Sequence, residues 1–298
     1  MTGFLCNNNC LMCSVKPKGL IYKSRHSKIL LDEIIKGKKM GYERIEFTGG
    51  EPTIRRDLVL LVKKAQKVGY KEIALSTNAR TLSSMEFLKT LQKSGLNRIT
   101  TTLYGDNAKN HEKITRTPLS FEQTIQGIKN SLQLGILTTV NTVVFSLTIK
   151  NLYKIGELLL SLGVKYWTLL DLIPDGYALN NYKNFAVSPS QLNKAFLKLV
   201  PLLSKFQVVN VFDFPFCLLP SSLLTLSNCN VLAAKGRTEI IKQVGYKPRR
   251  FSIKNQTYYD LHKIRLKRCL GCKYNKECGG VWIPYLNIYK AFFTKHFK

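Results

Sequence analysis

The chain has 298 residues, and its 46 Lys and Arg against 18 Asp and Glu give it a formal net charge of +28. Its apolar runs stay shorter than the ~18 residues that a membrane span needs, so we expect no stable membrane insertion. The lysines are dispersed along the chain, which indicates a biased composition more than a nucleic-acid footprint, so nucleic acid is a possible partner but not a favoured one.

Helical and strand patterns alternate with a steady period from residue 28 to about 173. Apolar residues on one helical face predict helices, and short apolar runs between them predict strands. The expected strands are 44–48, 72–77, 98–104, 137–145 and 165–173, and the expected helices are 29–37, 57–69, 83–93, 120–134 and 152–162. Glycines at 69, 95, 135 and 163 end helices shortly before strands, as in short αβ connections.

The run Gly3-Phe4-Leu5 leads into the first cysteine and is read as one further strand, which gives six strand–helix units. Strands that alternate with helices imply a parallel sheet with right-handed crossovers. Six units are too few for a closed eight-stranded barrel. We therefore predict an α/β fold, a partial (β/α)6 barrel of the TIM type.

The regular alternation ends after Pro174-Asp175-Gly176. One more helix is expected from Ser188 and one more strand at 208–214, whereas residues 217–298 show little alternation and hold five of the eight cysteines. We therefore place a domain boundary near residue 206. The barrel core takes residues 1–206, and a small, irregular, cysteine-rich domain takes residues 207–298.

Cysteine usage indicates a reducing compartment. Residues 1–5 carry no basic region before Cys6, so we expect no signal peptide. In a chain that is not exported, clustered cysteines are typical of metal ligands rather than of disulfides. A cytoplasmic location is therefore expected.

Cys6, Cys10 and Cys13 have the spacing C-x3-C-x2-C, and Gly49-Gly50-Glu51-Pro52 follows the next predicted strand. Three thiolates on one loop can hold three irons of a cubane cluster and leave the fourth iron open for chemistry. A zinc site would need a fourth ligand nearby, and the nearest candidate, His26, lies thirteen residues further on.

The cysteine spacing, the Gly-Gly-Glu-Pro segment and the strand–helix units together resemble the radical S-adenosylmethionine (SAM) enzymes. The resemblance implies a partial (β/α)6 barrel and a 4Fe–4S cluster with one open iron, held by Cys6, Cys10 and Cys13 at the catalytic site. It implies that SAM binds at the open iron. It further implies an electron donor such as flavodoxin or ferredoxin, and reductive cleavage of SAM to a 5′-deoxyadenosyl radical that abstracts hydrogen from a substrate.

The same resemblance implies that SAM is contacted from the strand ends, because barrel sites form at the carboxyl face. The implied contacts are Gly49, Gly50, Glu51, Asn78, Thr102, Arg116 and Asn141. Glycine is expected where the backbone itself approaches the ligand. Asp171, like Asn141 a polar residue in an apolar strand, is a further candidate for an inward-facing substrate or SAM contact. The alternatives are an ordinary strand threonine for Thr102, a solvated helix-end charge for Arg116, and a turn-proximal or core polar residue for Asn141 and Asp171. Met12 stands where the family commonly has an aromatic residue.

Cys269-x2-Cys272-x5-Cys278, followed by Gly279-Gly280-Val281-Trp282, resembles the SPASM and twitch extensions that hold auxiliary clusters. The cysteines beyond the first loop allow one auxiliary 4Fe–4S cluster. Cys217 is our choice for the fourth ligand, and Cys229 is its competitor. A structural zinc ribbon on the same thiolates is the alternative.

Relatives with such extensions modify peptides, activate enzymes or assemble cofactors. We expect a peptide or protein substrate and a maturase-type modification. The rival hypotheses are cofactor biosynthesis, RNA modification and, more remotely, a non-enzymatic metal-binding module.

Overall fold

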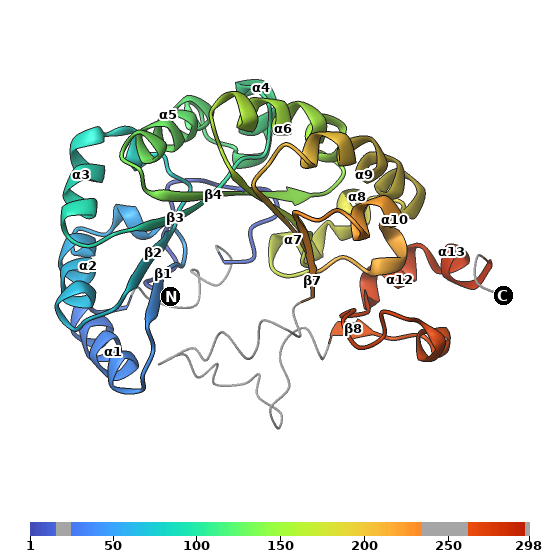
Figure 1. Ribbon diagram of the computed structural model, residues 1–298, viewed down its shortest axis with the longest axis horizontal. Helices are drawn as coiled ribbons and strands as arrows, with labels where there is room; N and C mark the ends of the chain where they lie inside the picture. Colours follow the sequence, from blue (N-terminus) through green and yellow to red (C-terminus); the bar gives the residue numbers. More distant parts are fainter. Residues whose placement is uncertain (16–24, 234–261, 296–298) are drawn as a thin grey trace.

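The computed structural model describes residues 1–15, 25–233 and 262–295 of the chain. Seven parallel strands form one sheet, and their order in the sheet is their order in the chain. They are β1 (Arg44–Phe47), β2 (Glu72–Ser76), β3 (Arg98–Thr102), β4 (Leu137–Val144), β5 (Tyr166–Asp171), β6 (Val208–Phe212) and β7 (Cys229–Leu232). Figure 1 shows the sheet curved into an open arc with the longer helices on its convex side. A parallel sheet with its helices outside is the predicted partial barrel, so the predicted fold class is confirmed.

The longer helices connect the strands in chain order. They are α1 (Ser27–Lys39), α2 (Leu58–Lys67), α3 (Met85–Lys93), α4 (Ala108–Thr115), α5 (Ser120–Gln133), α6 (Leu152–Ser161) and α9 (Pro189–Leu203). Shorter helices lie at α7 (Tyr177–Asn180), α8 (Tyr182–Phe185) and α10 (Ser221–Leu224). The C-terminal segment contributes a small hairpin of β8 (Lys263–Ile264) and β9 (Val281–Trp282), followed by α12 (Ile283–Ile288) and α13 (Lys290–Lys295).

The strands differ from the prediction at both ends of the sheet. The five strands expected between residues 44 and 173 all form, but residues 3–5 do not form a strand. They run beside the segment after β1, with the N–H of Gly50 donating to the carbonyl of Gly3 over 2.9 Å and the N–H of Glu51 donating to that of Leu5 over 2.7 Å. The strand expected at 208–214 forms as β6, and the unpredicted β7 follows it in the same sheet. The division of the chain near residue 206 stays a prediction.

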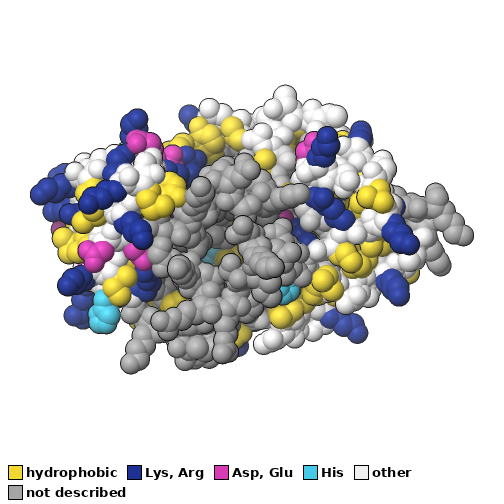
Figure 2. All heavy atoms as spheres, turned by 90° about the horizontal axis from the view of Figure 1, so that it is seen from below, with side chains coloured by type: hydrophobic (Ala, Val, Ile, Leu, Met, Phe, Trp, Pro, Cys, Tyr) yellow, Lys and Arg dark blue, Asp and Glu magenta, His cyan; other side chains and the backbone are white. Residues whose placement is uncertain are grey.

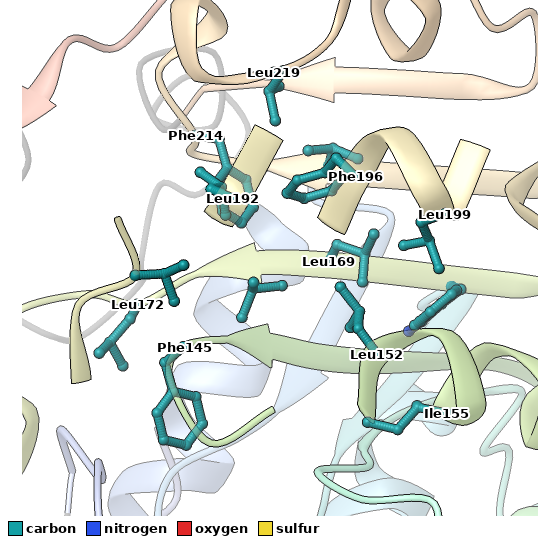
Figure 3. Close-up of a cluster of buried hydrophobic side chains, with 14 of the residues drawn as sticks. Phe145, Leu152, Ile155, Leu169, Leu172, Leu192, Phe196, Leu199, Phe214 and Leu219 are labelled. Atoms are coloured by element: carbon teal, nitrogen blue, oxygen red, sulfur yellow. The ribbon is translucent and has the colours of Figure 1, made fainter. Parts of the chain in front are cut away.

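Two clusters of buried apolar side chains stabilise the sheet. The smaller one packs α1, α2 and α3 against β1, β2 and β3. The larger one packs against β4, β5 and β6, where Leu169, Phe196 and Leu199 are almost fully buried (Figure 3). Trp282, Tyr285 and Phe293 belong to this larger cluster. The described part of the C-terminal segment therefore shares its core with the barrel, since burial of shared apolar surface is what holds such units together.

Charged side chains are scattered on the face of the molecule that Figure 2 draws. On the face that Figure 2 draws, Lys and Arg side chains lie over both ends of the molecule and are not gathered in one patch. Within the described ranges, no helix combines the length and the apolar character needed to cross a membrane.

Candidate functional site

A cavity of about 320 Å³ opens at the carboxyl ends of the strands. Cys6, Cys10 and Cys13 all line it. The ends of β1, β2 and β3 line one side with residues 48–51, residues 76–78, Thr102 and Tyr104, and the ends of β5 and β6 line another with residues 170–173, Phe212 and Asp213. The cavity therefore lies where the carboxyl face of a parallel barrel concentrates its functional groups.

Hydrogen bonds to the residues between the cysteines hold the three-cysteine loop in place. Arg80, just after β2, donates to the backbone oxygen of Asn7 and, over 3.0 Å, to Oδ1 of Asn8. Asn78 donates from Nδ2 to Oδ1 of Asn7 over 2.7 Å, and the N–H of Asn9 donates to the carbonyl of Thr115. The loop is thus fixed from β2 and from the end of α4 before any ligand binds.

The thiols fit a cubane cluster in kind and in position. None of the three cysteines forms a disulfide, and each is only half-buried beside the cavity. Among the residues that the structure describes, no three His, Cys, Asp or Glu side chains are arranged around a single metal ion. A cubane does not require such an arrangement, because each thiolate binds a different iron.

The Tyr104 ring lies beside these thiols. Burial, followed by the charges of Cys10, Cys13 and Cys6, holds the pKa of its phenol well above the ordinary value. Tyr104 therefore stays protonated, and it closes the cavity wall next to the cysteine loop.

Gly49 and Gly50 line the cavity as expected, but for a different steric reason. A Cβ at Gly50 would lie 2.1 Å from the carbonyl oxygen of Leu5, and one at Gly49 would lie 2.4 Å from that of Gly3. Gly49 also has a φ of +153°, which side chains rarely adopt. These glycines allow the segment after β1 to touch the N-terminal segment that carries the cysteine loop. Their contact with SAM stays a prediction.

The carboxylate of Glu51 is buried, and both of its oxygens accept hydrogen bonds from neighbouring residues. Oε1 accepts from the N–H of Thr53 over 3.0 Å and from the hydroxyl groups of Thr53 and Thr77, and Oε2 accepts from the N–H of Asn78 over 2.7 Å. Glu51 therefore ties the end of β1 to the end of β2. A direct contact of its carboxylate with SAM stays a prediction.

The structure brings most of the expected SAM contacts together. Asn78 and Thr102 line the cavity with Gly49, Gly50 and Glu51. Arg116 is exposed at the end of α4 with a φ of 55°, and Asn141 is half-buried in β4. Neither of these two is among the residues of the cavity wall. Their roles stay predictions.

His111 is a further residue of the cavity wall. It is buried, its Nδ1 accepts from the N–H of Tyr104 over 3.3 Å, and burial lowers its pKa to about 4. Its imidazole is therefore neutral with the proton on Nε2, and no described residue accepts from that atom.

Two carboxylates line the cavity at the ends of β5 and β6: Asp171 is the expected inward-facing candidate, and Asp213 was not predicted. Asp171 ends β5 and Asp213 follows β6, and both line the cavity. Lys263 of the C-terminal segment lies 2.6 Å from Oδ1 of Asp213, with both side chains almost fully buried, and its ammonium group lies 4.4 Å from the centre of the Trp282 ring. Burial raises the pKa of Asp171 to about 7. An aspartate within an apolar strand was the only signal that the sequence offered.

The C-terminal cysteines come near one another in part. Although Cys217 is partly open to solvent, burial and then the charges of Cys278 and Cys269 raise the pKa of its thiol to about 11. Burial alone does the same for Cys229. The Phe216 ring packs 5.0 Å from that of Tyr274, between Cys272 and Cys278 in the chain. The charges of Cys278 and Cys269 therefore influence the pKa of Cys217 but not that of Cys229.

Comparisons with known proteins agree with this geometry. The family model described as Radical SAM superfamily matches residues 2–159. The chain is 32% identical over 174 residues to a probable GTP 3′,8-cyclase of Saccharolobus islandicus, covering 58% of this chain and 55% of that protein. It is 34% identical over 145 residues to the GTP 3′,8-cyclase of Petrotoga mobilis. The matches span about half the length of these curated relatives.

Solved structures share the fold over nearly the whole chain. Native anSMEcpe with bound AdoMet superposes with a TM-score of 0.64 at 16% identity, covering 98% of this chain and 94% of that one. Streptococcus suis SuiB bound to the precursor peptide SuiA superposes with a TM-score of 0.65 at 12% identity, covering 94% and 70%. At these identities the likeness shows the fold alone.

Proposed function

The chain belongs to the radical SAM superfamily, and on that premise we propose that it modifies a peptide or protein substrate held at the carboxyl ends of its strands. The observation that supports this is one cavity lined both by the three thiols and by the ends of β5 and β6. The same cavity can thus bring the cofactors and the substrate together.

Cys6, Cys10 and Cys13 would hold a 4Fe–4S cluster with one open iron, and Gly49, Gly50, Glu51, Asn78 and Thr102 would surround SAM. Arg116 and Asn141 complete the proposed set. When bound, the cluster and SAM supply a 5′-deoxyadenosyl radical that takes a hydrogen atom from the substrate. Arg80 and Asn78 hold the loop, and the buried ring of His111 and the half-buried ring of Tyr104 limit the access of water to the wall beside it.

We propose further that residues 207–298 form an auxiliary domain of the SPASM or twitch kind. Cys217, Cys269, Cys272 and Cys278 would bind one auxiliary 4Fe–4S cluster. The influence of Cys278 and Cys269 on the Cys217 thiol supports this set over one that contains Cys229. An electron donor such as flavodoxin or ferredoxin, in a reducing cytoplasmic compartment, belongs to the same proposal.

The peptide substrate is supported at the level of fold, because structures of anSMEcpe and SuiB with bound peptides resemble this chain into its C-terminal segment. Cofactor biosynthesis from a nucleotide is the second candidate. It is favoured by the identity to GTP 3′,8-cyclases over the barrel core.

The test is reductive SAM cleavage by anaerobically reconstituted protein, with dithionite or reduced flavodoxin as the electron source. We expect 5′-deoxyadenosine from the wild type and none from the C6A/C10A/C13A variant. Stimulation by peptides encoded beside the gene supports the maturase proposal, and stimulation by GTP alone supports the nucleotide alternative. Equal product from the triple variant would overturn the assignment of the cysteine loop.

A further inference from the structure

Asp171 occupies an unusual place between the barrel and the C-terminal segment. It is the last residue of β5, it lines the main cavity, and it also borders a second, small cavity of about 20 Å³ beside Trp282. The indole Nε1–H of Trp282 donates to its Oδ2 over 3.0 Å, and the N–H of Leu172 donates to its Oδ1 over 2.9 Å. Each oxygen therefore has one fixed donor: Leu172, which also lines the main cavity, and Trp282, which does not.

Among the described residues, the one positive charge that acts on this carboxylate is shared with a second carboxylate. Lys263 is the nearby cation, but its ammonium group is engaged by Oδ1 of Asp213 over 2.6 Å and by the backbone oxygen of Asp213 over 2.8 Å. Asp213 itself adds a like charge near Asp171, and burial disfavours the ionised form further. A half-buried carboxylate with a perturbed pKa that lines a cavity is a candidate for function, because desolvating its charge is costly without a ligand.

The hydrogen bonds that are already made limit what the ligand can be. A carboxylate has about four acceptor positions, and Trp282 and Leu172 occupy two of them. The remaining positions suit two parallel N–H donors, the arrangement that carboxylates bind in a two-pronged way. A guanidinium group and the amide–amino edge of guanine both present such donors.

We propose that Asp171 recognises the substrate by accepting paired N–H donors from a planar nitrogen group, while Trp282 and Lys263 act as positioning residues that hold the acidic wall in place. This inference rests on the proposed function, because it assigns the far wall of the same cavity to the substrate. It also gives the C-terminal segment a role at the site: Lys263 lies before its cysteines and Trp282 lies after them in the chain.

The experiment measures binding without turnover. Anaerobically reconstituted full-length protein with saturating SAM and no reductant is dialysed against matched probes. N-acetyl-argininamide is compared with N-acetyl-citrullinamide, in which an oxygen replaces one nitrogen, and GTP is compared with ITP, which lacks the exocyclic amino group. We expect one donor-bearing probe to bind roughly ten- to hundredfold more tightly than its partner, the range for hydrogen bonds to a charged group.

The variants assign that preference to a residue. D171N keeps the shape of the side chain but places an amide where two acceptors are needed, so we expect the preference to disappear. W282F keeps the ring but removes the N–H, so we expect the preference to fall severalfold, whereas a mere packing role would weaken both probes of a pair equally. D106N, in the loop after β3 and away from the cavity wall, is the matched control and should keep the preference.

The outcomes separate the two proposals. A preference for the arginine probe identifies a peptide side chain as the source of the donors, and a preference for GTP identifies a nucleotide. No preference for either donor-bearing probe in the wild type, or a preference that persists in D171N, overturns the role of Asp171. SAM cleavage is measured separately, under reducing conditions. If the wild-type protein does not cleave SAM, the proposed function itself is wrong.

Discussion

The ammonium group of Lys263 lies 2.6 Å from the carboxylate of Asp213, across 50 residues of chain, and both side chains are almost fully buried. Breaking one half of a buried pair leaves an uncompensated charge, which costs about 3–5 kcal/mol. We therefore expect K263M and D213N each to lower the free energy of unfolding by about that amount, measured by denaturant titration of anaerobic protein. Asn suits the left-handed backbone of Asp213, which has a φ of 76°.

The K263M/D213N double variant is the check on this interpretation. If the pair is the cause, the double variant should be destabilised by much less than the sum of the single variants. K71M, which removes a partner of the exposed Glu43, is the surface control and should change little. Additive losses in the double variant would show that the two side chains act independently.

Arg80 is expected to matter for the cysteine loop without touching a thiol. Its guanidinium group donates to Asn7, Asn8 and Gln123, so R80M removes three contacts that join the loop to β2 and α5. We expect R80M to lose iron from the first loop several times faster than the wild type when a chelator is added. R98M, at the opposite end of β3, is the control, and equal rates in all three proteins would contradict the prediction.

The sequence was sufficient to predict those features that depend on residue spacing within one segment. The five strands between 44 and 173 and the meeting of the cysteines with Gly49 and Gly50 follow from local patterns, because parallel strands bring their carboxyl ends to one edge. The pairing of Lys263 with Asp213 has no local signature, because it depends on how the C-terminal segment packs. β7 was missed because this edge strand has no fully buried residue and lies beyond the regular alternation of helices and strands.

The roles of particular residues were harder to predict than their positions. Gly50 lines the cavity, and the carbonyl oxygen of Leu5 is already enough to require glycine there, whereas its contact with SAM stays a prediction. Glu51 also lines the cavity, yet its carboxylate already accepts hydrogen bonds from Thr53, Thr77 and Asn78. A sequence motif indicates which residues are important, whereas the structure is required to show which neighbours they contact.

The family resemblance implies that the exposed side chain of Arg116 contacts SAM, and this contact can be tested by mutation. If it pairs with the carboxylate of SAM, R116A should weaken SAM binding by about 1.5–3 kcal/mol, the scale of a hydrogen bond to a charged group. Because Arg116 is exposed, the free energy of unfolding should stay close to that of the wild type. K113A, on the same helix, should leave SAM affinity unchanged, and an equally unaffected R116A would remove this residue from the proposed site.

The metal content distinguishes an auxiliary cluster from a zinc ribbon. Two cubanes give about eight irons per chain, and C6A/C10A/C13A should retain about half of them. C217A should release the second cluster, whereas C229A should retain it, because only Cys217 is influenced by Cys269 and Cys278. Stoichiometric zinc without iron in the C6A/C10A/C13A variant would identify the C-terminal site as a structural ribbon.

Two buried groups should give the stability opposite dependences on pH. Burial raises the pKa of Asp171 to about 7, so its protonated form is favoured in the folded state and its contribution is lost as pH rises through 7. The charge of Lys263 lowers the pKa of Asp171 and the charge of Asp213 raises it, and the indole N–H of Trp282 donates a hydrogen bond to the Asp171 carboxylate. Burial lowers the pKa of His111 to about 4, so its neutral form is favoured and its contribution is lost as pH falls from about 6.5.

The two effects oppose each other in the wild type between about pH 6.5 and 5.5, and single variants separate them. Relative to D171N, the wild type should gain about 1.4 kcal/mol of stability for each pH unit below 7, which is the value of one proton bound on folding. Relative to H111Q, it should lose stability by a similar slope below 6.5. Denaturant titrations of anaerobic protein from pH 8 to 5.5 measure both differences. A gap between wild type and D171N that does not change with pH would mean that Asp171 is ionised alike in the folded and unfolded chains, and the acidic wall would then be far better solvated than its burial indicates.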